Sequence, residues 1–123
     1  MGNDAYRNLK VWQKAMKLVE LVYAQIRLFP DSEWYALSDQ LRRAVVSIPS
    51  NIAEGNGRAS NKDYAHFLSI AKGSLYETMT QLEIAVMLGY IQPNQEIEAL
   101  SVEVRRMLSS MIQRFSPYQT KEP

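Results

Sequence analysis

The sequence of 123 residues contains no cysteine, and its one histidine is His66. The absence of cysteine excludes disulfides and thiolate metal ligands, and it is typical of a protein in a reducing cytoplasm. A lone imidazole cannot complete a zinc site, so we expect neither a metal nor another cofactor. Ser47 and Ser74 have no general base within local reach, and we therefore expect no catalytic residues and no enzymatic activity.

Charge of one sign and long apolar runs are also lacking. The formal net charge is +1, whereas a dedicated nucleic-acid-binding domain is strongly basic. No apolar run reaches the roughly 18 residues that a membrane-spanning helix needs. The length fits one domain of ordinary size. We therefore expect a single cytoplasmic domain over residues 1–123, with no membrane partner.

What the sequence does contain is helical periodicity. Apolar residues recur at intervals of three and four in four segments, which predicts helices at about residues 8–29, 33–54, 62–88 and 93–115. No segment shows the alternation that is typical of a strand. Short connections between helices of roughly 20 residues favour antiparallel neighbours. The sequence therefore predicts an all-α fold, an up-down-up-down four-helix bundle.

The ends of these helices carry recognisable signals. Ser32 and Ser60 are expected to cap the second and third helices through their hydroxyls, and Pro93 is expected in the first turn of the fourth. The glycines at 55 and 57 are expected to close the second helix in the left-handed conformation. Pro49 predicts a bend in that helix without a break, because the apolar pattern continues beyond it.

The first and third helices are more apolar than one core requires, and Val46 of the second adds to the surplus. On the first helix we expect the core face to consist of Leu9, Trp12, Met16, Val19, Tyr23 and Ile26. The residues expected to lie outside the core are Val11, Leu18, Val22 and Phe29 on the first helix, Val46 on the second, and Ile70, Ile84 and Leu88 on the third. An exposed apolar strip usually marks a protein interface, so this surplus predicts self-association.

The basic residues leave two interpretations open. Candidate contacts to nucleic acid or to another partner are Arg42, Arg43, Arg58, Lys62, Lys72, Arg105 and Arg106, with further basic residues at Lys10, Lys14, Lys17 and Arg114. One interpretation is a set of phosphate contacts that oligomer symmetry multiplies. The other is ordinary surface charge interspersed with acids.

Four stretches resemble a known family. They are SIPSNIAEGNGRAS at 47–60, YRNLKVW at 6–12, FLSIAKGSLYE at 67–77, and Gln81-Leu82 followed by Leu88-Gly89-Tyr90. In their order along the chain they resemble the bacterial four-helix-bundle family of the 23S rRNA intervening-sequence proteins. The resemblance covers roughly residues 6–115.

The resemblance implies a left-handed bundle that assembles as a ring, a homopentamer. The family is named for a location inside ribosomal RNA genes and not for an activity. It is distantly similar to the accessory protein of diversity-generating retroelements, a basic pentamer that binds nucleic acid. The near-neutral charge of this chain departs from that relative.

The family resemblance also marks positions with structural roles: Pro49, Asn51, Glu54, Gly55, Gly73, Ser74 and Glu77. Asn51 and Glu54 are expected beside the turn, with Arg58 paired to Glu54. Gly73 and Ser74 are expected to permit tight helix contact. Glu77 is expected to find a basic partner in Arg42 or Arg43.

These observations favour a non-catalytic oligomeric scaffold of unknown cellular role, with RNA, DNA or a nucleoprotein as the partner beyond its own copies. The alternative is a protein-interaction or regulatory module that binds no nucleic acid. A continuous basic surface would favour the first hypothesis, and alternating charge the second.

Overall fold

The computed structural model describes residues 4–116. They form four α-helices, α1 Lys10–Ile26, α2 Leu37–Asn56, α3 Asn61–Met87 and α4 Gln95–Phe115. Two short 3-10 helices, η1 Ala5–Asn8 and η2 Asp31–Glu33, precede α1 and α2. Within these residues there is no strand, so the predicted all-α, four-helix fold is confirmed.

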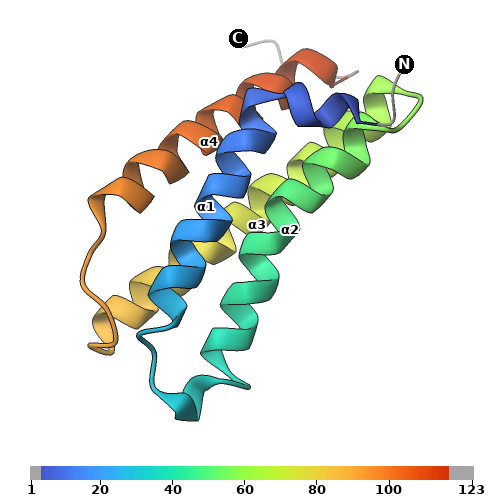
Figure 1. Cartoon of the computed structure of the whole chain (residues 1–123). Helices are drawn as coiled ribbons and strands as arrows, with labels where there is room; N and C mark the ends of the chain where they lie inside the picture. Colours follow the sequence, from blue (N-terminus) through green and yellow to red (C-terminus); the bar gives the residue numbers. More distant parts are fainter. Residues whose placement is uncertain (1–3, 117–123) are drawn as a thin grey trace, which may run out of the picture.

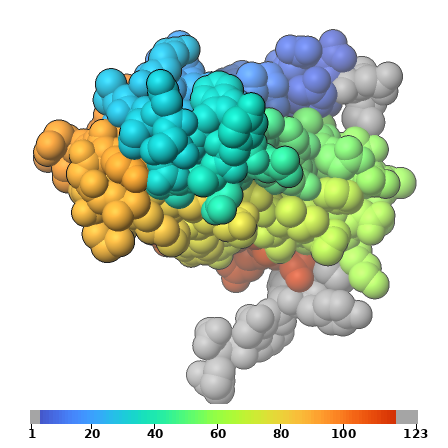
Figure 2. All heavy atoms as spheres, turned by 90° about the horizontal axis from the view of Figure 1, so that it is seen from below, coloured from blue at the N-terminus to red at the C-terminus, as the bar shows by residue number. Residues whose placement is uncertain are grey.

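The four helices lie side by side, and their connections gather at two ends (Figure 1). The start of α1, the α2–α3 turn and the end of α4 lie at one end, here termed the terminal end. The α1–α2 and α3–α4 connections lie at the other, the loop end, where they are adjacent when the molecule is viewed from below (Figure 2). The rings of Phe29 and Tyr90, one from each connection, have centroids 5.6 Å apart.

The core face of α1 differs from the prediction. Val11, Leu18, Val22 and Phe29, expected outside the core, are buried together with Ile26. Trp12, Val19 and Tyr23, expected inside, only flank the core, and Met16 is 44% exposed. The two stripes are adjacent on one helix, and periodicity alone does not say which of them faces the neighbouring helices.

On the other three helices, apolar residues that recur at intervals of three and four form the buried face. The buried apolar residues are Leu41, Ala44, Val45, Ile48 and Ile52 on α2, Ala65, Leu68, Ala71, Leu75, Leu82 and Ala85 on α3, and Ile97, Val104 and Leu108 on α4. Val46, Ile70 and Leu88 are exposed, as predicted, whereas Ile84 is half-buried. The bundle therefore has apolar residues outside its core. On α1 these are Met16 and its half-buried neighbours Trp12, Val19 and Tyr23, and not the stripe that was predicted.

The helix starts are capped partly as predicted. The Ser60 hydroxyl accepts a hydrogen bond from the Asp63 N–H at 3.1 Å, which confirms the cap of α3. At α4, Asn94 caps by accepting from the Ile97 N–H at 2.9 Å, so the helix begins after Pro93 and not with it. At α2, Ser32 lies in η2 and makes no cap. The carboxylate of Glu33 instead accepts from the Leu37 N–H at 3.1 Å.

The glycines of the second helix do not close it in a left-handed conformation. Gly55 lies inside α2, and Gly57 follows the helix with φ −83°. Among the described residues, only Gly89, after α3, has a positive φ (+82°). A β-carbon built on Gly55 would lie 2.8 Å from Cβ of Phe67 and 3.1 Å from Cδ1 of Tyr64. Gly55 is therefore required for the close approach of α3.

A polar bridge joins the middle of α2 to α3. The hydroxyls of Ser47 and Ser74 lie 2.8 Å apart, and the Asn51 amide donates to both the carbonyl and the hydroxyl of Ser47 at 2.8 Å. The Thr78 hydroxyl donates to the Ser74 carbonyl at 2.8 Å. The role predicted for Ser74 in a helix contact is thus confirmed, and Asn51 lies in this bridge and not beside the turn. Pro49 is buried in a continuous α2, so the predicted absence of a break is also confirmed.

The two helical glycines should respond in opposite directions to the same added methyl group. We expect Gly55→Ala to lower the free energy of unfolding by about 1–3 kcal/mol, because the new Cβ overlaps Phe67 and Tyr64. Gly73→Ala is the matched control. In the described part of the chain nothing lies within 4 Å of its added Cβ, so it should raise the stability by about 0.5–1 kcal/mol. Urea unfolding at one protein concentration measures both, and equal effects would contradict the assigned contact.

Candidate nucleic-acid interface

The charges of the bundle are divided between its two ends. When each helix is divided at its midpoint, nine basic residues of the described chain fall in the half that includes the terminal end: Arg7, Lys10, Lys14, Lys17, Arg58, Lys62, Lys72, Arg106 and Arg114. That half contains three acids: Asp4, Glu54 and Asp63. We call it the basic half.

The other half has the reverse composition and is called the acidic half. Its nine acids are Glu20, Asp31, Glu33, Asp39, Glu77, Glu83, Glu96, Glu98 and Glu103, and its three basic residues are Arg27, Arg42 and Arg43. Arg105 lies at the midpoint of α4. The formal net charge of +1 therefore conceals a strong separation of charge along the bundle axis.

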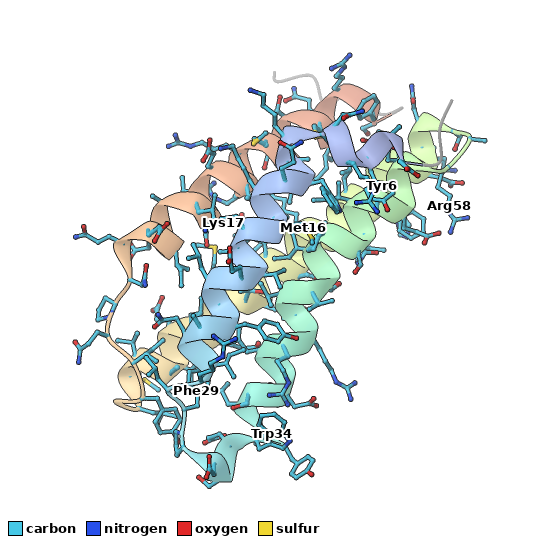
Figure 3. All side chains as sticks on the ribbon, viewed as in Figure 1. Tyr6, Met16, Lys17, Phe29, Trp34 and Arg58 are labelled. Carbon is cyan, nitrogen blue, oxygen red and sulfur yellow. The ribbon has the colours of Figure 1, made fainter. Side chains whose placement is uncertain are left out.

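Three lysines of the basic half line one pocket between α1 and α4. The pocket has a volume of about 380 Å³ and is formed by Lys10, Gln13, Lys14 and Lys17 with Leu100 of α4. In Figure 3, Lys17 lies on the side of α1 that faces α4, and Met16 lies toward α2. Lys14 pairs with Glu103 at 3.1 Å and Lys17 with Glu20 at 3.0 Å, in both cases with exposed side chains. Exposed pairs are weak, so a phosphate can compete for these ammonium groups.

The α2–α3 turn places two of the predicted nucleic-acid or partner contacts, Arg58 and Lys62, at the terminal end. Arg58 lies 2.6 Å from a carboxylate oxygen of Glu54, which confirms the predicted pair, and its guanidinium lies 4.7 Å from the Phe67 ring centroid. Figure 3 shows Arg58 at the same end of the bundle as Tyr6. Lys62, in the first turn of α3, is exposed and has no ion pair within the described chain.

Arg42 and Arg43 lie apart from the other candidates. Arg42 donates to the Trp34 carbonyl at 3.0 Å, and its guanidinium lies 4.2 Å from the centroid of the Trp34 ring. Asp39 lies 3.6 Å from Arg42 and 3.1 Å from Arg43. The Arg42 side chain is only 19% exposed, so this residue fastens the connection before α2. Arg43 is exposed, but it belongs to the acidic half.

The remaining candidates lie near the middle of the bundle. Lys72 and Arg105 are half-buried and Arg106 is exposed, and none of the three has an ion pair within residues 4–116. Arg7 was not among the residues expected from the sequence, and its guanidinium lies 5.5 Å from the Tyr6 ring and 5.9 Å from the Trp12 ring. Assigning each charged residue of the sequence to one half of its helix would have identified Arg7 as part of the basic half.

Two positions of the family pattern lack the contacts that were predicted for them. Glu77 is exposed, and neither Arg42 nor Arg43 reaches it, because both pair with Asp39 on their own helix. Gly73 is exposed, and among the described residues no atom lies within 4 Å of a β-carbon built on it. Both expectations were wrong within the described chain, because both residues are exposed on the surface of α3.

The described residues also bear on metal sites and membranes. Across residues 4–116, no three histidine, cysteine, aspartate or glutamate side chains lie together in a way that could hold a metal ion. No helix in the same range is long and apolar enough to cross a membrane. His66 is exposed, with its ring edge-on to Phe67 at 5.6 Å.

At the loop end, one hydrogen bond joins the two connections. The Tyr90 hydroxyl donates to the Glu33 carboxylate at 2.7 Å, and the other oxygen of Glu33 accepts from the Leu37 N–H. These two bonds, the one from Tyr90 first, lower the pKa of Glu33 below its ordinary 4.5. The same bond and partial burial raise the pKa of Tyr90 above 10.0.

The fold and the charge pattern define a class: a small all-α bundle of four helices with charge segregated along its axis. A family model for the 23S rRNA-intervening sequence protein matches residues 7–110, and the chain belongs to that family. It is similar to the crystal structure of a protein of unknown function from the S23 ribosomal protein family of Bacteroides thetaiotaomicron. The identity is 25%, the TM-score is 0.73, and the match covers 84% of this chain and 98% of the other. No curated protein matches at a significant level.

The bond between Glu33 and Tyr90 predicts two pH windows of stability loss. A carboxyl whose pKa is lowered by folding stabilises the protein above its unfolded value, and this contribution is lost as the pH falls below about 4.5. A tyrosine whose pKa is raised stabilises below 10.0, and this contribution is lost as the pH rises through the folded value. We expect Tyr90→Phe to weaken both dependences in urea unfolding at a series of pH values. Unchanged profiles would contradict the stabilising role of this bond.

Proposed function

We propose that the protein is a non-catalytic, self-assembling scaffold whose basic half binds the phosphate backbone of RNA or DNA. The observation that carries the proposal is the separation of charge, with nine basic residues against three acids in one half of the described bundle. Lysine and arginine contacts to phosphates supply most of the sequence-independent affinity for nucleic acid. The acidic half would be repelled by the same backbone, which orients the bundle on its ligand.

Self-assembly would strengthen this interface. In a cyclic oligomer every copy has the same orientation relative to the axis. The lysines at 10, 14, 17 and 62 would then recur around one band of the ring. The resemblance to the family supports five copies.

Apolar residues near the middle of the helices support a contact between copies. Met16 on the α2 side of α1 is 44% exposed, and Val46 on α2 is 40% exposed. Ile70 on α3 is exposed to a similar extent. Neighbouring Trp12 and Tyr23 are half-buried against the core, so a second copy would extend an apolar surface that the fold has already begun.

A second candidate function follows from the loop end. Five large apolar residues are exposed there: Leu28, Trp34, Tyr35, Met87 and Leu88. Phosphates do not bind apolar side chains, whereas protein partners do. This observation favours a protein-interaction module, and salt-insensitive capture of a protein by that end would favour it over nucleic-acid binding.

Nucleic-acid binding is tested by a salt titration with matched charge variants. We expect binding of a structured RNA fragment and of duplex DNA to weaken steeply with salt. Lys10→Gln/Lys62→Gln should reduce the slope of log K against log salt by about one for each phosphate that is no longer neutralised. Arg27→Gln/Arg43→Gln removes the same charge from the acidic half and should leave the slope unchanged. Equal effects of the two pairs, or no binding at low salt, would contradict the proposed interface.

Self-assembly is tested by sedimentation velocity at micromolar concentration. We expect the unaltered protein to sediment as an oligomer and Met16→Glu/Val46→Glu to sediment as a smaller species, because burying two carboxylates without partners is costly. Ala24→Glu/Thr80→Glu is the matched control at exposed positions of α1 and α3 and should leave the assembly intact. A monomeric unaltered protein would exclude the scaffold.

A further inference from the structure

A second pocket lies in the acidic half, away from the lysines. Its volume is about 390 Å³, within the range of small-molecule sites. The apolar part of its wall consists of Met79, Leu82 and Val86 of α3, Ile91 of the α3–α4 connection and Ile97 of α4. Gln25 of α1 closes another side. Three helices and one connection thus contribute to a concave, largely apolar surface.

The polar side chains of this pocket that have no bonding partner within the described chain include Ser101, Glu83 and Glu98. Ser101 is only 1% exposed, and its buried hydroxyl has no hydrogen-bond partner among residues 4–116. Glu98 and Ser101 are neighbours on α4, since residues three apart share a helix face. Glu83 contributes a carboxylate from α3, and neither Glu83 nor Glu98 forms an ion pair within residues 4–116. A buried hydroxyl without a partner is costly, so it marks a place where a ligand group can bind.

We propose that this pocket binds a small amphipathic amine, a ligand with an apolar body and a protonated ammonium group. The apolar wall would take the body. An ammonium group has three N–H donors and no acceptor, which matches two carboxylates and one hydroxyl oxygen. An anion would meet Glu83 and Glu98 without a compensating cation, because none of the residues that line the pocket is basic.

The pocket is independent of the proposed nucleic-acid interface. No residue that lines it also lines the lysine pocket between α1 and α4. Binding of an amine in this pocket therefore does not depend on phosphate binding by the basic half.

Methyl NMR of the full-length protein tests the proposal with three probes that share one hydrocarbon body. The probes are 2-phenylethylamine, the neutral 2-phenylethanol and the anionic phenylacetate. We expect the amine to shift the methyl signals of Leu82, Val86, Ile91 and Ile97 while that of Val11, in the core beyond the pocket, stays in place. Its Kd should be about tenfold lower than that of the alcohol, as expected for a charge-assisted hydrogen bond. Phenylacetate should bind most weakly.

Matched variants separate the carboxylates from overall charge. Glu83→Gln/Glu98→Gln should bring the amine to within about twofold of the alcohol, and Ser101→Ala should weaken the amine about fivefold. Glu77→Gln/Glu96→Gln removes the same charge from exposed positions outside the pocket and should change neither ligand. Both glutamates of the pocket are exposed, so their replacement should not unfold the protein. Equal affinities of amine and alcohol, or shifts that avoid the pocket methyls, would overturn the proposal.

Discussion

Gly55 of α2 lies so close to Tyr64 and Phe67 of α3 that an added methyl would overlap both side chains. The hydroxyls of Ser47 and Ser74 meet at 2.8 Å two turns away, which fixes the register of the same two helices. Because the turn between α2 and α3 is short, these two contacts together determine how α2 and α3 pack against each other. The buried faces that remain on α2 and α3 then determine where α1 and α4 pack.

The separation of charge depends on that arrangement. Lys62 at the start of α3 and Lys10 at the start of α1 are distant in the sequence, yet both belong to the basic half, because each is near the terminal end. The acids Glu96 and Glu98 lie in the first turn of α4, which is at the loop end. Basic and acidic segments alternate along the sequence. The packing of the helices gathers most of the basic residues in one half of the bundle and most of the acids in the other. A near-neutral protein thereby has a basic half, which we propose contacts phosphates, and an acidic half with the pocket that we propose binds an amine.

The candidate site was only partly predictable from the sequence. The sequence identified Arg58 and Lys62, which lie in the basic half, and the pair between Arg58 and Glu54 follows from their spacing of four residues. It also grouped Arg42 with them. The structure separates Arg42, because this arginine stacks on Trp34 and donates to its carbonyl. Such a contact depends on the path of the connection before α2, which local periodicity does not specify.

The number of helices, their approximate ends and the buried faces of three of them were determined by the sequence itself, because a 3.6-residue repeat of apolar side chains is a local property. The tertiary structure decided which of two apolar stripes of α1 enters the core. Val11 and Leu18 are buried while Met16 is exposed, and both stripes satisfy the same periodicity. Only packing against α2 and α4 distinguishes them. The division of charge between the two halves was likewise decided by the tertiary structure, since it depends on which helix ends lie together.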